Sequence, residues 1–260
     1  TSTVVGTFRA DLSGLDGQAA RVFASGILNG TPAFGLFAAF PDGTVVEFPP
    51  ASTNGRIQII HNSPSATVDI YADNSLLVDD LVFRTATAFI DVPGDVPVNV
   101  KVAPANSTSA ADAFATFPVT FEVGKTYVIT AAGIVNDPTT PFNLFINENG
   151  KEAAQFPFGV DAAVFHGATN APAVDVDAVF DAPNVVQNLA YGNYTSYLNL
   201  GTNKYDLAIR ANGSPDVLYS YRADLTGLAG NAVTVFASGL IGGIPEFGLF
   251  AALADGTVAE

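Results

Sequence analysis

Residues 5–47 read VGTFRADLSGLDGQAARVFASGILNGTPAFGLFAAFPDGTVVE, and residues 218–260 repeat them as LYSYRADLTGLAGNAVTVFASGLIGGIPEFGLFAALADGTVAE. The two stretches align without a gap at an offset of 213 residues. From the pair Thr1/Ser214 onward, about 27 of the 47 aligned pairs are identical. An internal repeat this strong indicates an array of similar structural units.

A weaker copy of the same pattern lies at residues 117–156, with a strand, a Gly turn, a second strand, Gly, Pro and a Phe-x-Leu-Phe strand. We call this recurring type the X half. A second type, the Y half, begins with IQIIHNSPSATVDIYADNS at residue 57 and with AAVFHGATNAPAVDVDAVF at residue 162. The chain therefore reads X-Y-X-Y-X.

Each half consists of short apolar runs separated by clusters of turn residues. The runs are rich in Val, Thr, Phe and Tyr, which favour pleated and half-buried surfaces. Asn-Gly and Asp-Gly pairs supply the positive φ angles of tight hairpins. No segment keeps a helical period over ten residues. These features predict an all-β fold of tandem immunoglobulin-like antiparallel β-sandwiches, with about seven strands in each Y-X pair.

Five halves make two complete sandwiches and leave one X half over. We expect a half-domain at 1–50, which is the second half of a β-sandwich repeat, and sandwich domains at 56–156 and 161–260. A half-sandwich exposes an apolar face and unpaired strand edges that invite strand addition. Two arrangements would satisfy it: an upstream Y half in a longer array, or head-to-tail docking on another copy of the chain.

Composition limits the partners. The 260 residues carry 25 acidic and 10 basic side chains, a net charge of −15, which disfavours nucleic acid. No apolar stretch approaches the ~20 residues of a membrane-spanning helix, so we expect no membrane insertion. The absence of cysteine excludes disulfides and thiolate metal sites. Since Thr1 is not a natural start, we expect that a signal peptide was removed or that the chain is part of a longer protein.

The region from Arg56 to Val135 resembles a known bacterial family, the domain of unknown function 4397. The matching motifs are HNSPSATVDIYADN, DVPGDVPVNVKVAP and FEVGKTYVITAAG, and HGATNAPAVDVDA at residue 166 is a degraded version of the first. The resemblance implies an immunoglobulin-like module in a secreted or cell-surface setting, often beside other repeats. It implies no established chemistry.

The two histidines, His61 and His166, occupy equivalent places at a strand end. They are candidates for metal ligands or general bases. Their recurrence in both Y halves favours a structural turn role, because scaffold positions repeat and active sites seldom do. The chain also lacks a Gly-x-Ser-x-Gly elbow. We therefore expect no enzymatic activity and no catalytic residue.

Two groups of aspartates are candidates for weak calcium binding, since calcium prefers oxygen ligands. The first is Asp69 with Asp73, and the second is Asp175 with Asp177 and Asp181. Their spacing differs from that of an EF-hand loop. Apart from this weak calcium, we expect no cofactor.

Three tyrosines, Tyr191, Tyr194 and Tyr197, alternate with small polar residues and predict an exposed patch suited to glycan contact. The recurring Phe-x-x-Phe pairs fit core packing better. The favoured function is a non-enzymatic structural repeat protein, a building block of a surface fibre or filament or an adhesin stalk. The alternative is a β-sandwich module that binds glycan or another surface ligand.

Overall fold

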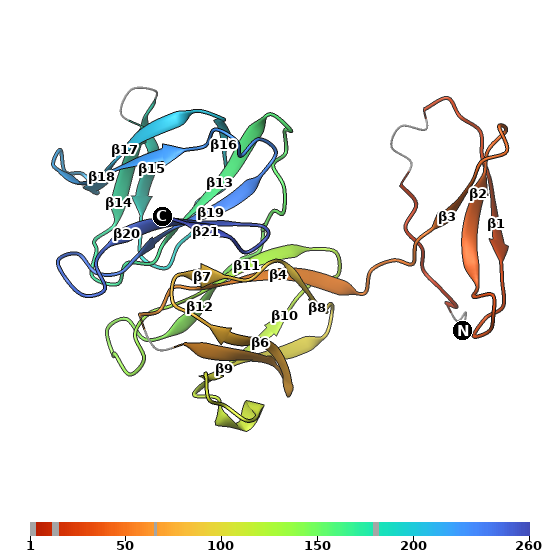
Figure 1. Ribbon diagram of the computed structural model, residues 1–260, viewed down its shortest axis with the longest axis horizontal. Coiled ribbons are helices and arrows are strands. Elements are labelled where there is room, and N and C mark those ends of the chain that lie inside the picture. The colour runs from red at the N-terminus through yellow and green to blue at the C-terminus, as the bar shows by residue number, and fades with distance from the viewer. Residues whose placement is uncertain (1–3, 12–15, 65–66, 179–181) are drawn as a thin grey trace. The chain divides into compact units, whose positions relative to one another are not determined.

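The computed structural model describes residues 4–11, 16–64, 67–178 and 182–260 (Figure 1). The chain divides into two compact units, unit 1 at Thr1–Thr53 and unit 2 at Asn54–Glu260. In the described part of the chain no helix is long and apolar enough to cross a membrane.

Unit 1 contains one antiparallel sheet in the order β1-β2-β3. Its strands are β1 (Arg21–Ser25), β2 (Gly35–Ala39) and β3 (Val45–Phe48). The turn between β2 and β3 uses Asp42 and Gly43. Asp42 Oδ1 accepts a hydrogen bond from the Thr44 amide at 2.9 Å, and Gly43 takes a φ of 88°. The Asp-Gly pair thus forms the tight turn that the sequence predicts.

Unit 2 contains two β-sandwiches. The first comprises β4 (Asn54–His61), β5 (Val68–Ala72), β6 (Ser75–Leu81), β7 (Thr85–Ala86), β8 (Ile90–Pro93), β9 (Pro97–Pro104), β10 (Ala115–Thr120), β11 (Thr126–Ala132) and β12 (Asn143–Asn147). One of its sheets has the order β12-β11-β4-β7, with β8 also paired to β4, and the other has the order β10-β9-β5-β6. A one-turn 3₁₀ helix, η1 (Ala110–Asp112), begins at the N-cap Ser109.

The second sandwich repeats this plan. It comprises β13 (Gly159–His166), β14 (Val174–Ala178), β15 (Ala182–Leu189), β16 (Leu198–Gly201), β17 (Lys204–Ala211), β18 (Val217–Asp224), β19 (Ala232–Ser238), β20 (Gly248–Leu253) and β21 (Val258–Ala259). Its sheets have the orders β16-β13-β19-β20-β21 and β15-β14-β17-β18. The predicted fold of tandem β-sandwiches is confirmed.

In each sandwich, the first strand of the Y half pairs in parallel with the middle strand of the following X half. β4 pairs with β11, so that His61 lies opposite Ala131, and β13 pairs with β19, so that His166 lies opposite Ala237. All other strand pairings between named strands of the described chain are antiparallel. The parallel pair joins the two halves into one sheet.

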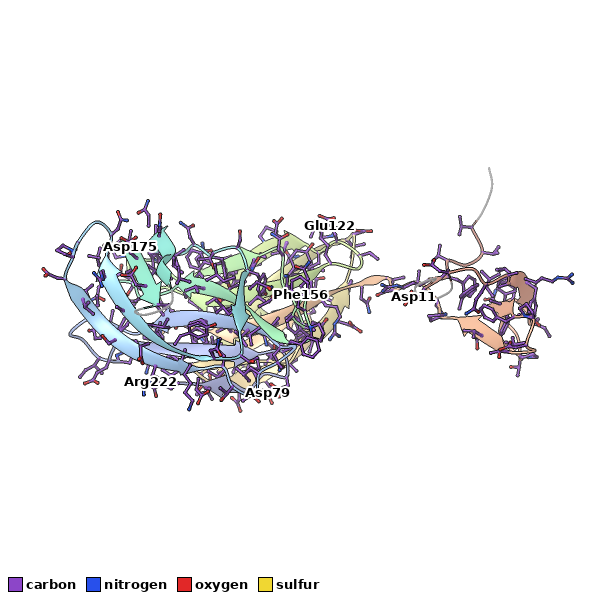
Figure 2. The ribbon with its side chains drawn as sticks, turned by 90° about the horizontal axis from the view of Figure 1, so that it is seen from above. Asp11, Asp79, Glu122, Phe156, Asp175 and Arg222 are labelled. Carbon is purple, nitrogen blue, oxygen red and sulfur yellow. The ribbon has the colours of Figure 1, made fainter. Side chains whose placement is uncertain are left out.

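The cores lie between the two sheets of each sandwich. In the first, the buried cluster includes Ile57, Ile59, Val68, Ile70, Val100, Val102, Phe121, Tyr127 and Ile129. In the second, Val174, Val186, Leu189 and Ile209 form the equivalent cluster. Charged side chains such as Asp79 and Glu122 are exposed and lie at the periphery of the view in Figure 2. This arrangement follows from burial of apolar surface, which stabilises the fold by roughly 25 cal/mol per Å².

The central strands are buried on both faces. In β4, Ile57 and Ile59 face the core of the first sandwich, while the intervening Gln58 and the following Ile60 face the other way and are also buried. A strand buried on both faces has no polar face, which explains why the sequence of these strands is a continuous apolar run rather than an alternation.

Limited proteolysis should cut the chain first near residues 50–53, where no strand of the described chain runs, and leave a stable fragment that begins near Asn54. Mass spectrometry of the fragments at low protease concentration would measure this. A primary cut at 105–112, inside the first sandwich, would contradict the division.

Candidate functional site

The second buried face of the central strands is covered by the other sandwich. Residues of both sandwiches form one apolar cluster, which we call the inter-sandwich core: Ile60, Phe89, Val128, Ala132, Phe165, Phe236, Phe250 and Ala252. The first four come from the first sandwich and the last four from β13, β19 and β20 of the second. Figure 1 shows β20 and β21 beside β7, β4 and β11. The two sandwiches therefore pack sheet against sheet.

Polar side chains of the first sandwich bind backbone carbonyls of the second. Gln58 Nε2 donates to the Leu253 carbonyl at 2.7 Å and to the Thr87 carbonyl of its own sandwich at 3.0 Å. Asn62 Nδ2 donates to the Ala237 carbonyl at 3.0 Å. Both side chains are almost fully buried. A buried amide without partners would be costly, so these bonds fix the relative position of the two sheets.

Arg84 crosses the same boundary with its guanidinium. Its centre lies 4.5 Å from the ring centroid of Phe250, and Nε donates to Ser238 Oγ at 3.0 Å. Nη2 donates to the Glu246 carbonyl. Partial burial lowers the pKa of Arg84. Sequence reasoning missed Gln58, Asn62 and Arg84; the signal for Gln58 was a single amide within an otherwise apolar run.

The three tyrosines predicted to form an exposed patch are half-buried at this boundary, so the prediction of exposure is wrong. The Tyr194 hydroxyl lies 2.6 Å from Thr130 Oγ1, and its ring lies 4.6 Å from that of Phe165. The Tyr197 hydroxyl accepts from the Lys151 amide at 3.0 Å. The sequence could not show this, because alternation with small residues is equally typical of a packed strand end. Glycan contact by these residues stays a prediction.

Tyr191 is the third member of this set, and its ring packs edge-on against Phe145 and His166, with centroid distances of 5.7 and 6.2 Å. Its hydroxyl oxygen is buried without a hydrogen-bond partner among the described residues. Burial raises the pKa of Tyr191 to about 12 and also raises the pKa values of Tyr194 and Tyr197. None of the three is therefore ionised at neutral pH.

The two histidines are almost fully buried, with exposed fractions of 0% for His61 and 1% for His166. His61 Nδ1 accepts a hydrogen bond from the Ser63 amide at 3.4 Å. His166 Nε2 lies 2.9 Å from the Pro172 carbonyl, to which it can donate. Burial lowers the pKa of His166, which keeps the ring neutral near pH 7. Each ring thus bonds to the segment that follows it.

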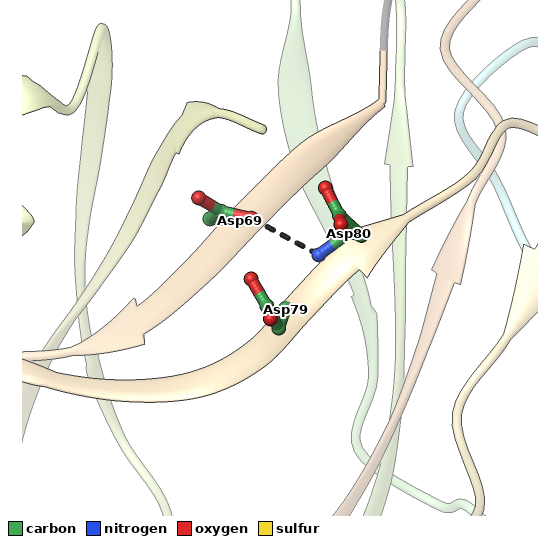
Figure 3. A group of neighbouring side chains, drawn as sticks. All are labelled: Asp69, Asp79 and Asp80. Atoms are coloured by element: carbon green, nitrogen blue, oxygen red, sulfur yellow. Dashed lines mark hydrogen bonds between the residues drawn. The ribbon is translucent and has the colours of Figure 1, made fainter. Parts of the chain in front are cut away.

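The neighbours of Asp69 in the structure differ from those that the sequence predicts. Asp69 lies with Asp79 and Asp80, as Figure 3 shows, rather than with Asp73. Asp69 Oδ1 accepts from the Asp80 amide at 3.0 Å, and Oδ2 accepts from Ser107 Oγ at 2.5 Å. Asp73 instead accepts from the Asn99 amide. A calcium ion at this group stays a prediction.

In the second group of aspartates, the described carboxylates also have partners within the protein. Asp175 accepts from the amides of Asn188 at 2.7 Å and Gly213 at 3.2 Å, which lowers its pKa. Asp177 pairs with Arg210 at 3.1 Å. Asp181 lies outside the described residues.

Asp69 and Asp175 make equivalent hydrogen bonds in the two sandwiches. Each occupies the second position of its strand, and each accepts a hydrogen bond from an amide on the next strand. The two donors, Asp80 and Asn188, have φ angles of 53° and 49°, in the left-handed region. The pairings concerned, β5 with β6 and β14 with β15, both contain register shifts. The aspartate therefore holds an irregular strand in place, which accounts for its recurrence in both Y halves.

The family model of the domain of unknown function DUF4397 matches residues 55–156 and 160–251. The chain belongs to the DUF4397 family. The first matched segment covers the first sandwich, and the second covers the second sandwich as far as β20. The resemblance seen in the sequence is confirmed.

Two further comparisons, with curated proteins and with solved structures, concern the whole DUF4397 chain. No curated protein matches its sequence. Among solved structures, the Bacillus anthracis TIE protein is similar at 9% sequence identity with a TM-score of 0.22. The alignment covers 89% of this chain and 48% of that one, so the chain spans about half the length of that protein.

The buried histidine of the second DUF4397 sandwich should make stability depend on pH. Its pKa is lowered in the folded state, so below its ordinary value near 6.5 the unfolded chain binds the proton more readily than the folded one. The free energy of unfolding should therefore fall as the pH drops below about 6.5, until the folded pKa is passed. Denaturant titrations at pH 7.5 and pH 5.5 would measure this.

The variant His166→Asn is the control for that experiment, because Asn does not titrate. The stability difference between the wild type and this variant should shrink as the pH falls. A difference that grows with falling pH would show that the charged ring is favoured in the fold.

Replacing the buried aspartate should cost more than replacing its exposed neighbour. Asp69→Ala removes both acceptors and leaves the Asp80 amide unbonded, for a loss of about 2 kcal/mol in unfolding free energy. Asp79→Ala, at an exposed member of the same group, should change it by less than about 0.5 kcal/mol. Thermal unfolding with and without calcium would compare them. A calcium-dependent rise in Tm that both variants abolish would make the group a metal site instead.

Proposed function

We propose that this chain is a non-enzymatic structural repeat protein of the cell surface or secreted space, a building block of a fibre, a filament or an adhesin stalk. The observation that supports this best is the inter-sandwich core. Two sandwiches that could have been joined by a flexible linker instead share one apolar cluster. Domains of one chain are expected to move relative to one another unless their interface is large and hydrophobic. Unit 2 should therefore behave as one stiff element.

The connection between the sandwiches supports the same role. Asp161, at the start of β13, is completely buried and accepts three hydrogen bonds. Lys151 Nζ donates at 2.5 Å and the Gln155 amide at 3.1 Å, both from the segment that follows β12, and Asn199 Nδ2 supplies the third. A buried charge is tolerated only when it is paired and hydrogen-bonded. The segment that links the two sandwiches is thus hydrogen-bonded, through Lys151 and Gln155, to the first strand of the second sandwich.

The aromatic side chains that a glycan-binding module would present are largely used in packing. Phe145, Phe165 and Tyr194 pack against one another across the boundary as tilted rings, with centroid distances of 5.5 and 4.6 Å. Sugar stacking requires an exposed aromatic face. The packing therefore favours the structural role over the ligand-binding one. The surface setting rests on the family resemblance.

Two neighbouring residues of β13 test the stiffness directly, because they face opposite ways. Phe165 lies in the inter-sandwich core and Val164 packs against the core of the second sandwich. Phe165→Ala should lower the unfolding free energy by about 3–5 kcal/mol and split unfolding of unit 2 into two transitions. Val164→Ala should lower stability by less and keep a single transition. Calorimetry of the full chain would distinguish these outcomes, and a wild type that unfolds in two steps would contradict the stiff element.

The function itself is tested by what the full chain does at rising concentration. We expect ordered assemblies in negative-stain microscopy and no specific signal on a glycan array. A monodisperse monomer that binds one glycan class, with binding lost in Tyr191→Ala or Tyr197→Ala, would replace the structural role by the ligand-binding one.

A further inference from the structure

The first X half is closely similar in sequence to the third but differs from it in burial. VFAS occurs at residues 22–25 in β1 and at residues 235–238 in β19. Phe236 is completely buried, whereas its counterpart Phe23 is 42% exposed, and every residue of β1 is exposed. Of the apolar residues described in unit 1, only Ala38 and Phe48 are buried. A cluster of two buried side chains is far smaller than the core of a stable domain.

Despite this exposure, the first X half already has the geometry of the third. Phe23 lies opposite Phe37 in the β1–β2 pairing, as Phe236 lies opposite Phe250 in β19–β20. Both phenylalanine pairs are stacked, each with a centroid distance of 5.6 Å. The loops match as well, since the Ile27 amide donates to the Pro32 carbonyl and the Leu240 amide donates to the Pro245 carbonyl, both at 2.9 Å. The half is therefore preformed and lacks only what covers it.

The second sandwich shows what covers an X half. On one side of β19 lies β20, and on the other lies β13 of the Y half in parallel register. β1 has the counterpart of β20, namely β2, but among the described residues it pairs with no strand on its other edge. Similarly, β18 pairs with β17 of the Y half, while its counterpart at residues 4–11 forms no strand. Both missing neighbours belong to a Y half.

The space that a Y half would fill is present in unit 1. A hollow of about 460 Å³ is lined by apolar residues that include Val5, Phe8, Ile27 and Phe34. In the second sandwich, Phe247 occupies the place of Phe34, and the gap that it lines has a volume of only about 20 Å³. That gap is closed by Y-half side chains, including Val164, Val174 and Ile209.

A second copy of residues 1–260 cannot supply this cover without opening another half. Each copy carries three X halves and two Y halves, and both Y halves are already paired with the X halves that follow them. A Y half donated from one copy to another would leave its own X half uncovered.

We propose that unit 1 is an acceptor site for a Y-type segment of DUF4397 sequence, of the kind that residues 159–211 represent in this chain. Its first strand adds in parallel to the free edge of β1, and its apolar side chains fill the hollow beneath Phe34. In the register of the second sandwich, a residue equivalent to Phe165 lies opposite Phe23. A strand equivalent to β17 orders residues 4–11 as the counterpart of β18.

The occupant is defined by its sequence chemistry. It carries a mainly apolar first strand like VDAAVFH, because β13 is buried on both faces. It also carries apolar residues at the positions of Val174, Val176 and Ile209. Main-chain hydrogen bonds give such strand addition its affinity and the pockets for side chains give its specificity. This site deepens the proposed function and rests on it for its biological meaning, since an acceptor half is a means of joining one array of repeats to the next.

The test adds the occupant to the full chain. Residues 157–213 are placed directly before Thr1, which reproduces the order of the second sandwich because Thr1 aligns with Ser214. Hydrogen exchange followed by mass spectrometry then reports on residues 21–25 and 4–11. In the extended chain, exchange there should slow by at least about 100-fold relative to the unextended chain. The control extension carries Val164→Pro and Phe165→Pro in the added copy and should give no protection.

The outcomes separate the alternatives. No protection in the extended chain, at an unchanged exchange pattern of residues 54–260, would overturn the acceptor site while leaving the structural role of unit 2 intact. Equal protection with the proline control would show that the added strand is not the cover. Protection of residues 21–25 in the unextended chain that rises with concentration would identify a second copy as the occupant and would also overturn the proposal. Phe23→Ala should lower the stability of the extended chain and leave that of the unextended chain unchanged.

Discussion

The architecture depends on one pairing, the parallel alignment of the first Y strand with the middle X strand. In both sandwiches this pair lies at the centre of a sheet whose two faces are both covered. Parallel strands are found almost only where both faces are buried, and the continuous apolar sequence of these strands meets that requirement. Once the pair forms, one face of its strands packs in the core of its own sandwich. The other face is also largely apolar and has to be covered by another part of the chain. In the inter-sandwich core, each sandwich covers this second face of the other.

The same constraint explains why unit 1 stands out. Its β1 has the sequence of a strand that is buried on both faces, yet it pairs on one edge only within the described chain. An unpaired apolar edge is a template for adding another strand. Proteins usually shield such edges with charge or proline, and β1 offers a single charged residue, Arg21, at its start. Burial in one copy and exposure in the other are thus two states of one sequence, separated by the presence of the Y half.

Several buried polar residues make hydrogen bonds that support this packing. Asp69 and Asp175 hold irregular strands, and Gln58 and Asn62 bond carbonyls across the boundary between the sandwiches. His166 is kept neutral by burial. The recurrence of this aspartate in both Y halves, as Asp69 and Asp175, is accounted for by these contacts.

The sequence by itself determined the repeat, the all-β class, the alternation of X and Y halves and the family, because turn residues and apolar runs act locally and recur at fixed offsets. It also indicated that one X half is left without a Y half. Only the tertiary structure decided the parallel pairing, the sheet-to-sheet contact of the sandwiches and the burial of Tyr191, Tyr194 and Tyr197. These depend on contacts between residues far apart in the chain. A tyrosine beside small polar residues has the same sequence pattern whether water or another sheet lies against its ring, so local sequence could not distinguish the two.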